Sequence, residues 1–152
     1  MSSTYELVKN FKKSYPSTIT WWRLKAHSKL VDKYLGPKEK VLYAFAGQND
    51  NSYSSIFNTA VLAITNERLI VSQDRLLVGY KFLSITPDMY NDLTIDAGLI
   101  WGTVILDTVK EMIYFSNISK KALPEIQLKI SSHMNEAKKC YPDKKRKECE
   151  NS

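Results

Sequence analysis

Few residues in this sequence are suited to catalysis. Two histidines, His27 and His133, fall on segments whose apolar residues recur at helical spacing, where a histidine usually packs as part of the helix. His133 and Cys140 are close enough in sequence to share a helix face, but no third residue is placed to orient them as a nucleophile and a base. We therefore expect no catalytic residues and a protein that is not an enzyme.

Motifs for metals and phosphate groups are also missing. The cysteines, Cys140 and Cys149, have a spacing that fits no zinc or redox pair, so we expect free thiols in a reducing compartment. The segment Asn49-Asp50-Asn51 resembles the start of a calcium loop, but Ala60 or Val61 stands where the loop needs its closing glutamate. The five glycines are scattered and form no phosphate loop. The sequence predicts no metal site and no cofactor.

Two groups of cationic and aromatic residues are candidate contact sites for a lipid surface or a partner. A tryptophan pair beside an arginine and a lysine suits a membrane interface, although the favoured explanation is that at least one tryptophan packs its helix against the β-domain. A basic cluster near the C-terminus suits anionic lipid or nucleic acid, or simply a solvated tail. The candidate residues are Trp21, Trp22, Arg23, Lys25, Lys144, Lys145, Arg146 and Lys147.

The elements that carry these residues belong to a chain of 152 residues, about the length of one domain. The net charge of +6 sits at the two ends, because residues 1–40 hold nine Lys and Arg against three acids, while residues 41–137 hold seven against ten. No apolar run approaches the roughly 18 residues that span a membrane. The first residues lack the apolar stretch of a signal peptide, so we expect a cytoplasmic protein.

Residues 1–37 are predicted to form an N-terminal helical segment. A first apolar stripe covers Tyr5–Phe11 and is ended by Pro16. A second helix is expected from Trp21 to Leu35, with Thr20 as its N-cap. The sequence leaves open whether these helices pack on the rest of the chain.

After Pro37 the period of the apolar residues falls to about two, which predicts strands. Turn residues interrupt the pattern every eight to twelve residues, as in a β-sandwich or a β-barrel. The expected strands are 39–48, 56–65, 69–73, 76–85, 93–96, 99–107 and 111–115.

The pattern returns to helix near Pro124, with an apolar stripe of Leu123, Ile126, Ile130 and Met134. This helix would cover an open face of the β-structure. Residues 138–152 are rich in lysine and lack periodicity, so we expect a disordered basic tail. The predicted organisation is therefore a helical segment, a β-domain closed by a helix over residues 38–137, and the tail.

One turn carries a resemblance to a known family. The segment Ala63-Ile64-Thr65-Asn66-Glu67-Arg68-Leu69-Ile70-Val71 resembles a strand–turn–strand unit of the small bacterial pleckstrin-homology (PH) proteins. The later segments that resemble the same family are Leu83–Ile85, Gly98–Leu106, Met112–Phe115 and Ile118–Ile130. The resemblance implies an α+β fold that is mainly β: a PH-like sandwich or barrel of seven strands, closed by a C-terminal helix and preceded by N-terminal helices.

The resemblance does not bring the usual phosphoinositide site with it. PH domains that bind these lipids use Lys and Arg at the end of the first strand and in the following loop, and here Gln48–Ser55 contains neither. Recognition of phosphate needs several charge-assisted donors at close range. We expect no phosphoinositide binding by that loop.

The resemblance implies a binding or scaffolding module that acts through protein–protein contacts or self-association, for which exposed strand edges are suited. The alternative is a peripheral membrane protein that contacts anionic lipid through the Trp21-Trp22 helix and the basic tail. Nucleic acid is not favoured, because Lys81 is nearly alone among the basic residues of the expected strands.

Overall fold

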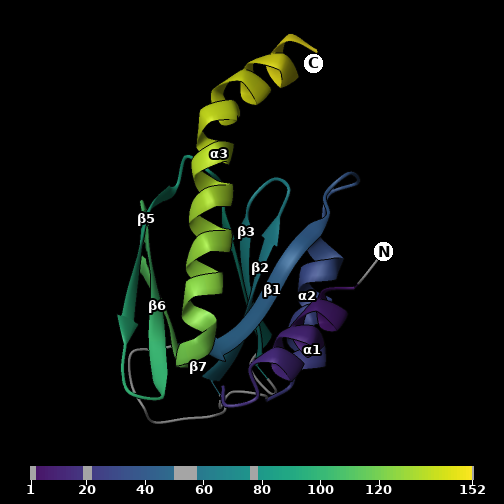
Figure 1. The fold of residues 1–152 in the computed structure, drawn as a ribbon. Helices are drawn as coiled ribbons and strands as arrows, with labels where there is room; N and C mark the ends of the chain where they lie inside the picture. Colours follow the sequence, from purple (N-terminus) through teal and green to yellow (C-terminus); the bar gives the residue numbers. More distant parts are fainter. Residues whose placement is uncertain (1–2, 19–21, 50–57, 76–78, 152) are drawn as a thin grey trace.

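The computed structural model describes residues 3–18, 22–49, 58–75 and 79–151. In these residues the chain forms two helices, then an antiparallel sheet, then a long helix (Figure 1). The elements are α1 (Thr4–Ser14), α2 (Leu24–Tyr34), β1 (Val41–Gln48), β2 (Thr59–Thr65), β3 (Leu69–Arg75), β4 (Gly79–Ile85), β5 (Tyr90–Ala97), β6 (Trp101–Thr108), β7 (Met112–Ser119), η2 (Lys120–Ala122) and α3 (Leu123–Glu150).

The seven strands follow the order β4-β3-β2-β1-β7-β6-β5, so the first and last strands of the sequence meet in the middle of the sheet. The junction is narrow, with Gln48 of β1 opposite Ser116 of β7. The sheet curls at this junction into two arms, a first arm of β1 to β4 and a second arm of β5 to β7. Helix α3 lies in the hollow between the arms (Figure 1).

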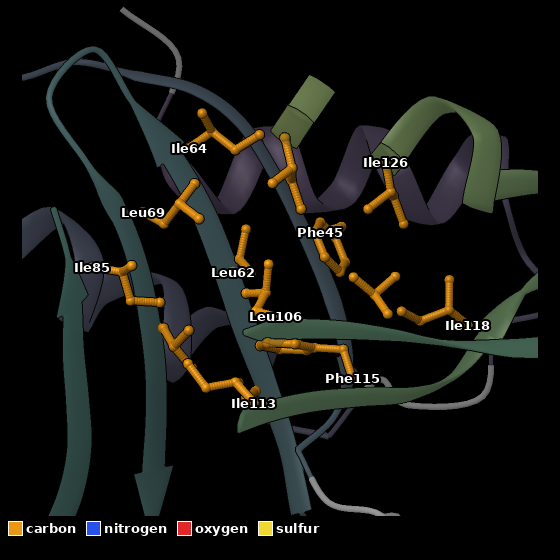
Figure 2. Packing of buried hydrophobic residues seen from close by; sticks show 14 of the residues in the cluster. Phe45, Leu62, Ile64, Leu69, Ile85, Leu106, Ile113, Phe115, Ile118 and Ile126 are labelled. Atoms are coloured by element: carbon orange, nitrogen blue, oxygen red, sulfur yellow. The ribbon is translucent and has the colours of Figure 1, made fainter. Parts of the chain in front are cut away.

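The main core fills the space between the arms and α3. Phe45 from β1 meets Phe115 from β7 edge-on, with 5.6 Å between the ring centroids. Ile126, Ile130 and Met134 bury one stripe of α3 against this cluster. Figure 2 shows the side chains of both arms pointing toward one another around Phe45 and Phe115. The predicted apolar stripe of the C-terminal helix is confirmed.

Helices α1 and α2 cover the outer face of the first arm and form a second apolar cluster with it. Val8 of α1 and Val31 of α2 are fully buried there. The strands meet them with small or β-branched residues, which let the helix backbones approach the sheet closely. The strand members of this cluster are Ala44, Ala46, Val61, Ala63 and Ile70. The N-terminal helices are therefore integral to the packing of the sheet, a point that the sequence left open.

The fold expected from the resemblance is confirmed: the chain has seven antiparallel strands, a closing C-terminal helix and N-terminal helices. Three strands are longer than expected, and the first of them, β3, continues to Arg75 rather than ending at residue 73. β5 begins at Tyr90 rather than at residue 93, and β7 continues to Ser119 because a register shift between Gly102 and Val104 keeps it paired with β6.

Helix α2 begins three residues later than predicted, and its N-cap is Arg23 rather than Thr20. Arg23 adopts the left-handed conformation, with φ of 52°, and its side chain donates to Asp74 on β3 at 2.7 Å. A tertiary ion pair thus fixes the start of this helix where local sequence preference indicated a side-chain cap.

The prediction of a disordered tail is wrong, because α3 continues as one helix through Glu150 with Pro142 inside it. Contacts made beyond the apolar stripe explain the difference. Lys138 lies over the ring of Tyr90 at 5.7 Å, and Tyr141 donates a hydrogen bond to Asp88 in the turn after β4. These contacts hold the helix past the point where its apolar periodicity ends. Among the described residues, no helix is long and apolar enough to cross a membrane.

Candidate functional site

The predicted aromatic and cationic site near α2 is only partly available for an external contact. Trp21 lies outside the described residues. Trp22 is exposed, and its backbone carbonyl accepts a hydrogen bond from His27 at 2.8 Å. Arg23 is engaged by Asp74, whereas Lys25 is exposed. One of the four residues is therefore committed to an internal ion pair.

The predicted basic cluster lies on the last turns of α3, which project beyond the sheet (Figure 1). Lys145, Arg146 and Lys147 are exposed, while the side chain of Lys144 lies outside the described part of the chain. Lys145 lies over the ring of Tyr141 at 5.7 Å. The structure places this cluster and the α2 residues on separate elements and does not bring them together as one site.

His27 is fully buried and joins α2 to β3. Its Nδ1 accepts the backbone N–H of Asp74 at 2.7 Å, so its Nε2 carries the proton that it donates to the carbonyl of Trp22. Burial lowers the pKa of His27 and favours the neutral ring that this pattern requires. Both ring nitrogens are used inside the fold, which is a structural role.

The turn that carries the family resemblance holds a buried ion pair. Arg68 donates two hydrogen bonds to Glu39, of 2.9 and 3.0 Å. It also donates to the Ser84 hydroxyl and to the Tyr34 carbonyl. The hydroxyl of Thr65 donates to Glu39 at 2.7 Å. Burial acts to raise the pKa of the Glu39 carboxyl, but the bonds from Arg68, the Gly36 N–H and Thr65 outweigh it and lower that pKa. The motif therefore ties the β2–β3 turn to the segment before β1, to the end of α2 and to β4.

A carboxylate with two tyrosines is the nearest approach to an acid–base cluster. Glu125, in the first turn of α3, accepts a hydrogen bond from the hydroxyl of Tyr43 at 3.0 Å and another from Tyr15. Burial raises the pKa of Tyr43, so both phenols stay protonated and act as donors. The cluster ties α1, β1 and α3 together. Within the described ranges, no group of three His, Cys, Asp or Glu residues could hold a metal ion.

The outer edge of the first arm is the strand β4, which pairs with β3 alone among the described strands. An aromatic cluster lies along this strand, and the sequence analysis did not single it out. Tyr80 is 47% exposed, its hydroxyl is bonded to that of Tyr34, and the Tyr34 ring lies 4.5 Å from Phe82. The signal for this cluster was present as alternating aromatic residues in β4, but their proximity to α2 depends on the tertiary fold.

The other edge of the sheet, β5, differs from β4 in two ways. Its ladder with β6 has a register shift between Tyr90 and Asp92, and it exposes the carboxylates of Asp92 and Asp96. Bulges and charged residues are the usual means by which sheet edges avoid pairing with other strands. β4 has no register shift and carries one charged residue, Lys81. Of the two edges, β4 is the one suited to accept another strand.

The crystal structure of a pleckstrin homology domain from Shewanella amazonensis SB2B is similar to this chain, with 13% identity, a TM-score of 0.47, and coverage of 74% of this chain and 88% of that one. No curated protein matches the sequence. The sequence model for the bacterial PH domain matches residues 35–132, which run from the end of α2 into α3. The chain belongs to the bacterial PH domain family.

Proposed function

We propose that this chain is a cytoplasmic, non-enzymatic binding module that works through protein–protein contacts, and that its partner at the β4 edge is a second copy of the chain. The observation that carries the proposal is the open, regular edge of β4 beside the exposed Tyr34 and Tyr80 rings. A strand at such an edge presents unpaired N–H and C=O groups. Antiparallel pairing of β4 with β4 of a second copy gives a symmetric dimer with one continuous sheet.

The side chains at this edge support the same conclusion. Aromatic residues are enriched at the centre of protein interfaces because they bury a large area for little loss of conformational freedom. Tyr34 and Phe82 are already packed on one another, and Arg68 lies over the Phe82 ring at 5.8 Å, so the surface is held in place before a partner arrives. The buried ion pair of Arg68 and Glu39 holds Arg68 in this position.

The test is the mass of the full chain in solution, measured by light scattering over a range of protein and salt concentrations. We expect about twice the monomer mass of 17.5 kDa, with little dependence on salt, because the contact is made by backbone and aromatic groups. Tyr80→Asp places a carboxylate on the edge and should return the mass to that of the monomer. Thr94→Asp makes the same kind of change on the β5 edge and should leave the dimer intact. A monomeric mass for the unaltered chain at every concentration would overturn the proposal.

A further inference from the structure

The connection between β5 and β6 exposes apolar residues where a hairpin normally has polar ones. Leu99 is 95% exposed and Ile100 is 55% exposed, and Trp101 follows as the first, also exposed, residue of β6. Tight connections between strands favour Gly, Asn and Asp, whose side chains suit the backbone and water. We call Leu99, Ile100 and Trp101 the apolar tip. Residues that break local rules of this kind without a packing reason are often functional.

The apolar tip is held rigidly by the chain around it. The N–H of Gly98 donates to the Trp101 carbonyl at 2.9 Å, and the N–H of Lys120 donates to the Ile100 carbonyl at 2.9 Å. The indole Nε1 of Trp101 donates to the carbonyl of Ser17 at 2.7 Å. A Cβ at Gly98 would lie 2.9 Å from the Trp101 carbonyl oxygen, so only glycine allows this approach. The backbone of the tip and the Trp101 indole are therefore restrained by hydrogen bonds and have little conformational entropy left to lose on binding.

Two cations flank the apolar tip. Lys120 and Lys121, in η2, are exposed, and neither makes an ion pair with a described residue. Together with Leu99 and Ile100 of the tip they line a pocket of about 610 Å³, to which Ser17 and Ser119 also contribute. The same hairpin carries three aspartates: Asp96 is the nearest to the tip in sequence, whereas Asp92 and Asp107 lie toward the other end of the hairpin. The surface thus combines projecting aliphatic side chains, an indole and a lysine pair.

We propose that the apolar tip docks the protein on the surface of an anionic lipid bilayer. Leu99 and Ile100 enter the boundary between headgroups and acyl chains, and Trp101 lies at the interface that tryptophan prefers. Lys120 and Lys121 contact the lipid phosphates. A bilayer is favoured over a protein pocket because the aliphatic side chains project from a hairpin and are bordered by cations, which matches an apolar layer beneath a negatively charged surface.

This site is separate from the other surfaces considered above. It lies where η2 and α3 begin, whereas the basic cluster Lys144–Lys147 lies at the far end of α3 (Figure 1). It also involves no residue of the β4 edge, so lipid binding by the apolar tip does not depend on dimer formation. The β6–β7 connection offers a matched control, since Val109 is 67% exposed, is followed by Lys110, and lies at the opposite end of β6.

The test is sedimentation of the full chain with vesicles of equal parts phosphatidylglycerol and phosphatidylcholine, and with vesicles of phosphatidylcholine alone. We expect pelleting with the anionic vesicles, stronger at low salt than at physiological salt, where charges are screened beyond about 8 Å. The double variant Leu99→Asp with Ile100→Asp should weaken binding at least tenfold. Lys120→Gln and Lys121→Gln should each weaken it about fivefold, the equivalent of about 1 kcal/mol per lysine. Val109→Asp should bind like the unaltered chain.

The fluorescence of Trp101 provides a second readout, with an expected blue shift on addition of anionic vesicles that Trp101→Phe removes. Absence of pelleting with the anionic vesicles at low salt would overturn the proposal. Binding that survives the Leu99 and Ile100 changes but is lost when Lys144, Lys145, Arg146 and Lys147 are all replaced by Gln would overturn it as well, because the tail would then be the lipid contact. Circular dichroism of each variant establishes that the fold is retained.

Discussion

The inner strands of the first arm, β2 and most of β3, are buried on both faces, whereas β5 to β7 are covered on the α3 side only. In the first arm every residue of β2 is buried, between α1 and α2 on one face and the main core on the other. In the second arm burial alternates along β6, with Val104 and Leu106 facing the core and Thr103 and Ile105 partly exposed. The same antiparallel architecture thus serves an arm whose inner strands are enclosed and an arm with a free outer face.

The difference separates structural residues from those available for binding. His27 and the pair of Arg68 and Glu39 are buried polar groups that join other elements to the first arm. The second arm carries exposed apolar residues at both ends of β6, Leu99 and Ile100 at one and Val109 at the other. Substitutions of these buried polar residues should therefore change stability, whereas substitutions at the β4 edge and at the apolar tip should change binding.

The largest effect should come from breaking the buried ion pair. Arg68→Ala leaves Glu39 buried without its cation, and loss of one partner of a buried pair costs about 3–5 kcal/mol of the free energy of unfolding. Urea denaturation measures this loss. Arg23→Ala removes an arginine from a more exposed pair with Asp74 and should cost less than about 1 kcal/mol.

A double variant sharpens this comparison. Arg68→Met combined with Glu39→Leu removes both charges and should be more stable than Arg68→Ala, because no buried charge is then left alone. Equal losses of the free energy of unfolding for Arg68→Ala and Arg23→Ala would contradict the view that the buried ion pair of the family motif stabilises the fold more than the exposed one.

A smaller effect should follow from the protonation of His27. Burial lowers its folded-state pKa, so the folded protein binds fewer protons than the unfolded chain once the pH falls below about 6.5, the ordinary pKa of histidine. Stability is therefore fully present above that pH and declines below it, by at most about 1.4 kcal/mol per pH unit for one proton. Denaturation between neutral pH and pH 5 measures the slope.

His27→Gln is the control for this pH dependence, because it has no proton to gain and should show a flatter profile. Carboxyl groups with a lowered pKa, such as Glu39, contribute only at lower pH and do not obscure this window. An unchanged slope in His27→Gln would show that another group is responsible.

Much of the fold could be predicted from the sequence because local patterns and tertiary packing agree. The period-two pattern located all seven strands to within a few residues, and the stripe from Leu123 to Met134 located the helix of the core. Where local patterns and tertiary packing disagree, the prediction from the sequence is wrong. The start of α2 is set by the pairing of Arg23 with Asp74, and the last turns of α3 are held by Tyr141 and Lys138, contacts that no local pattern displays.

The candidate binding surfaces were harder to predict for the same reason. An open sheet edge was expected, but only the strand order shows that the edges are β4 and β5. The sequence pattern places Leu99 and Ile100 in the strand 99–107, whereas β5 runs to Ala97 and β6 begins at Trp101, so both residues lie at a hairpin tip instead. Trp22 and the basic cluster were visible in composition, yet the fold does not bring them together.

The central claim, that the two edges of the sheet have different roles, is tested most directly by amide hydrogen exchange of the full chain at low and high protein concentration. Edge amides without a partner exchange readily, and pairing with a second strand slows them. The account predicts that exchange in β4, residues Gly79–Ile85, slows as concentration rises while exchange in β5, residues Tyr90–Ala97, does not change. Slowing confined to β5, or no dependence on concentration in either strand, would contradict it.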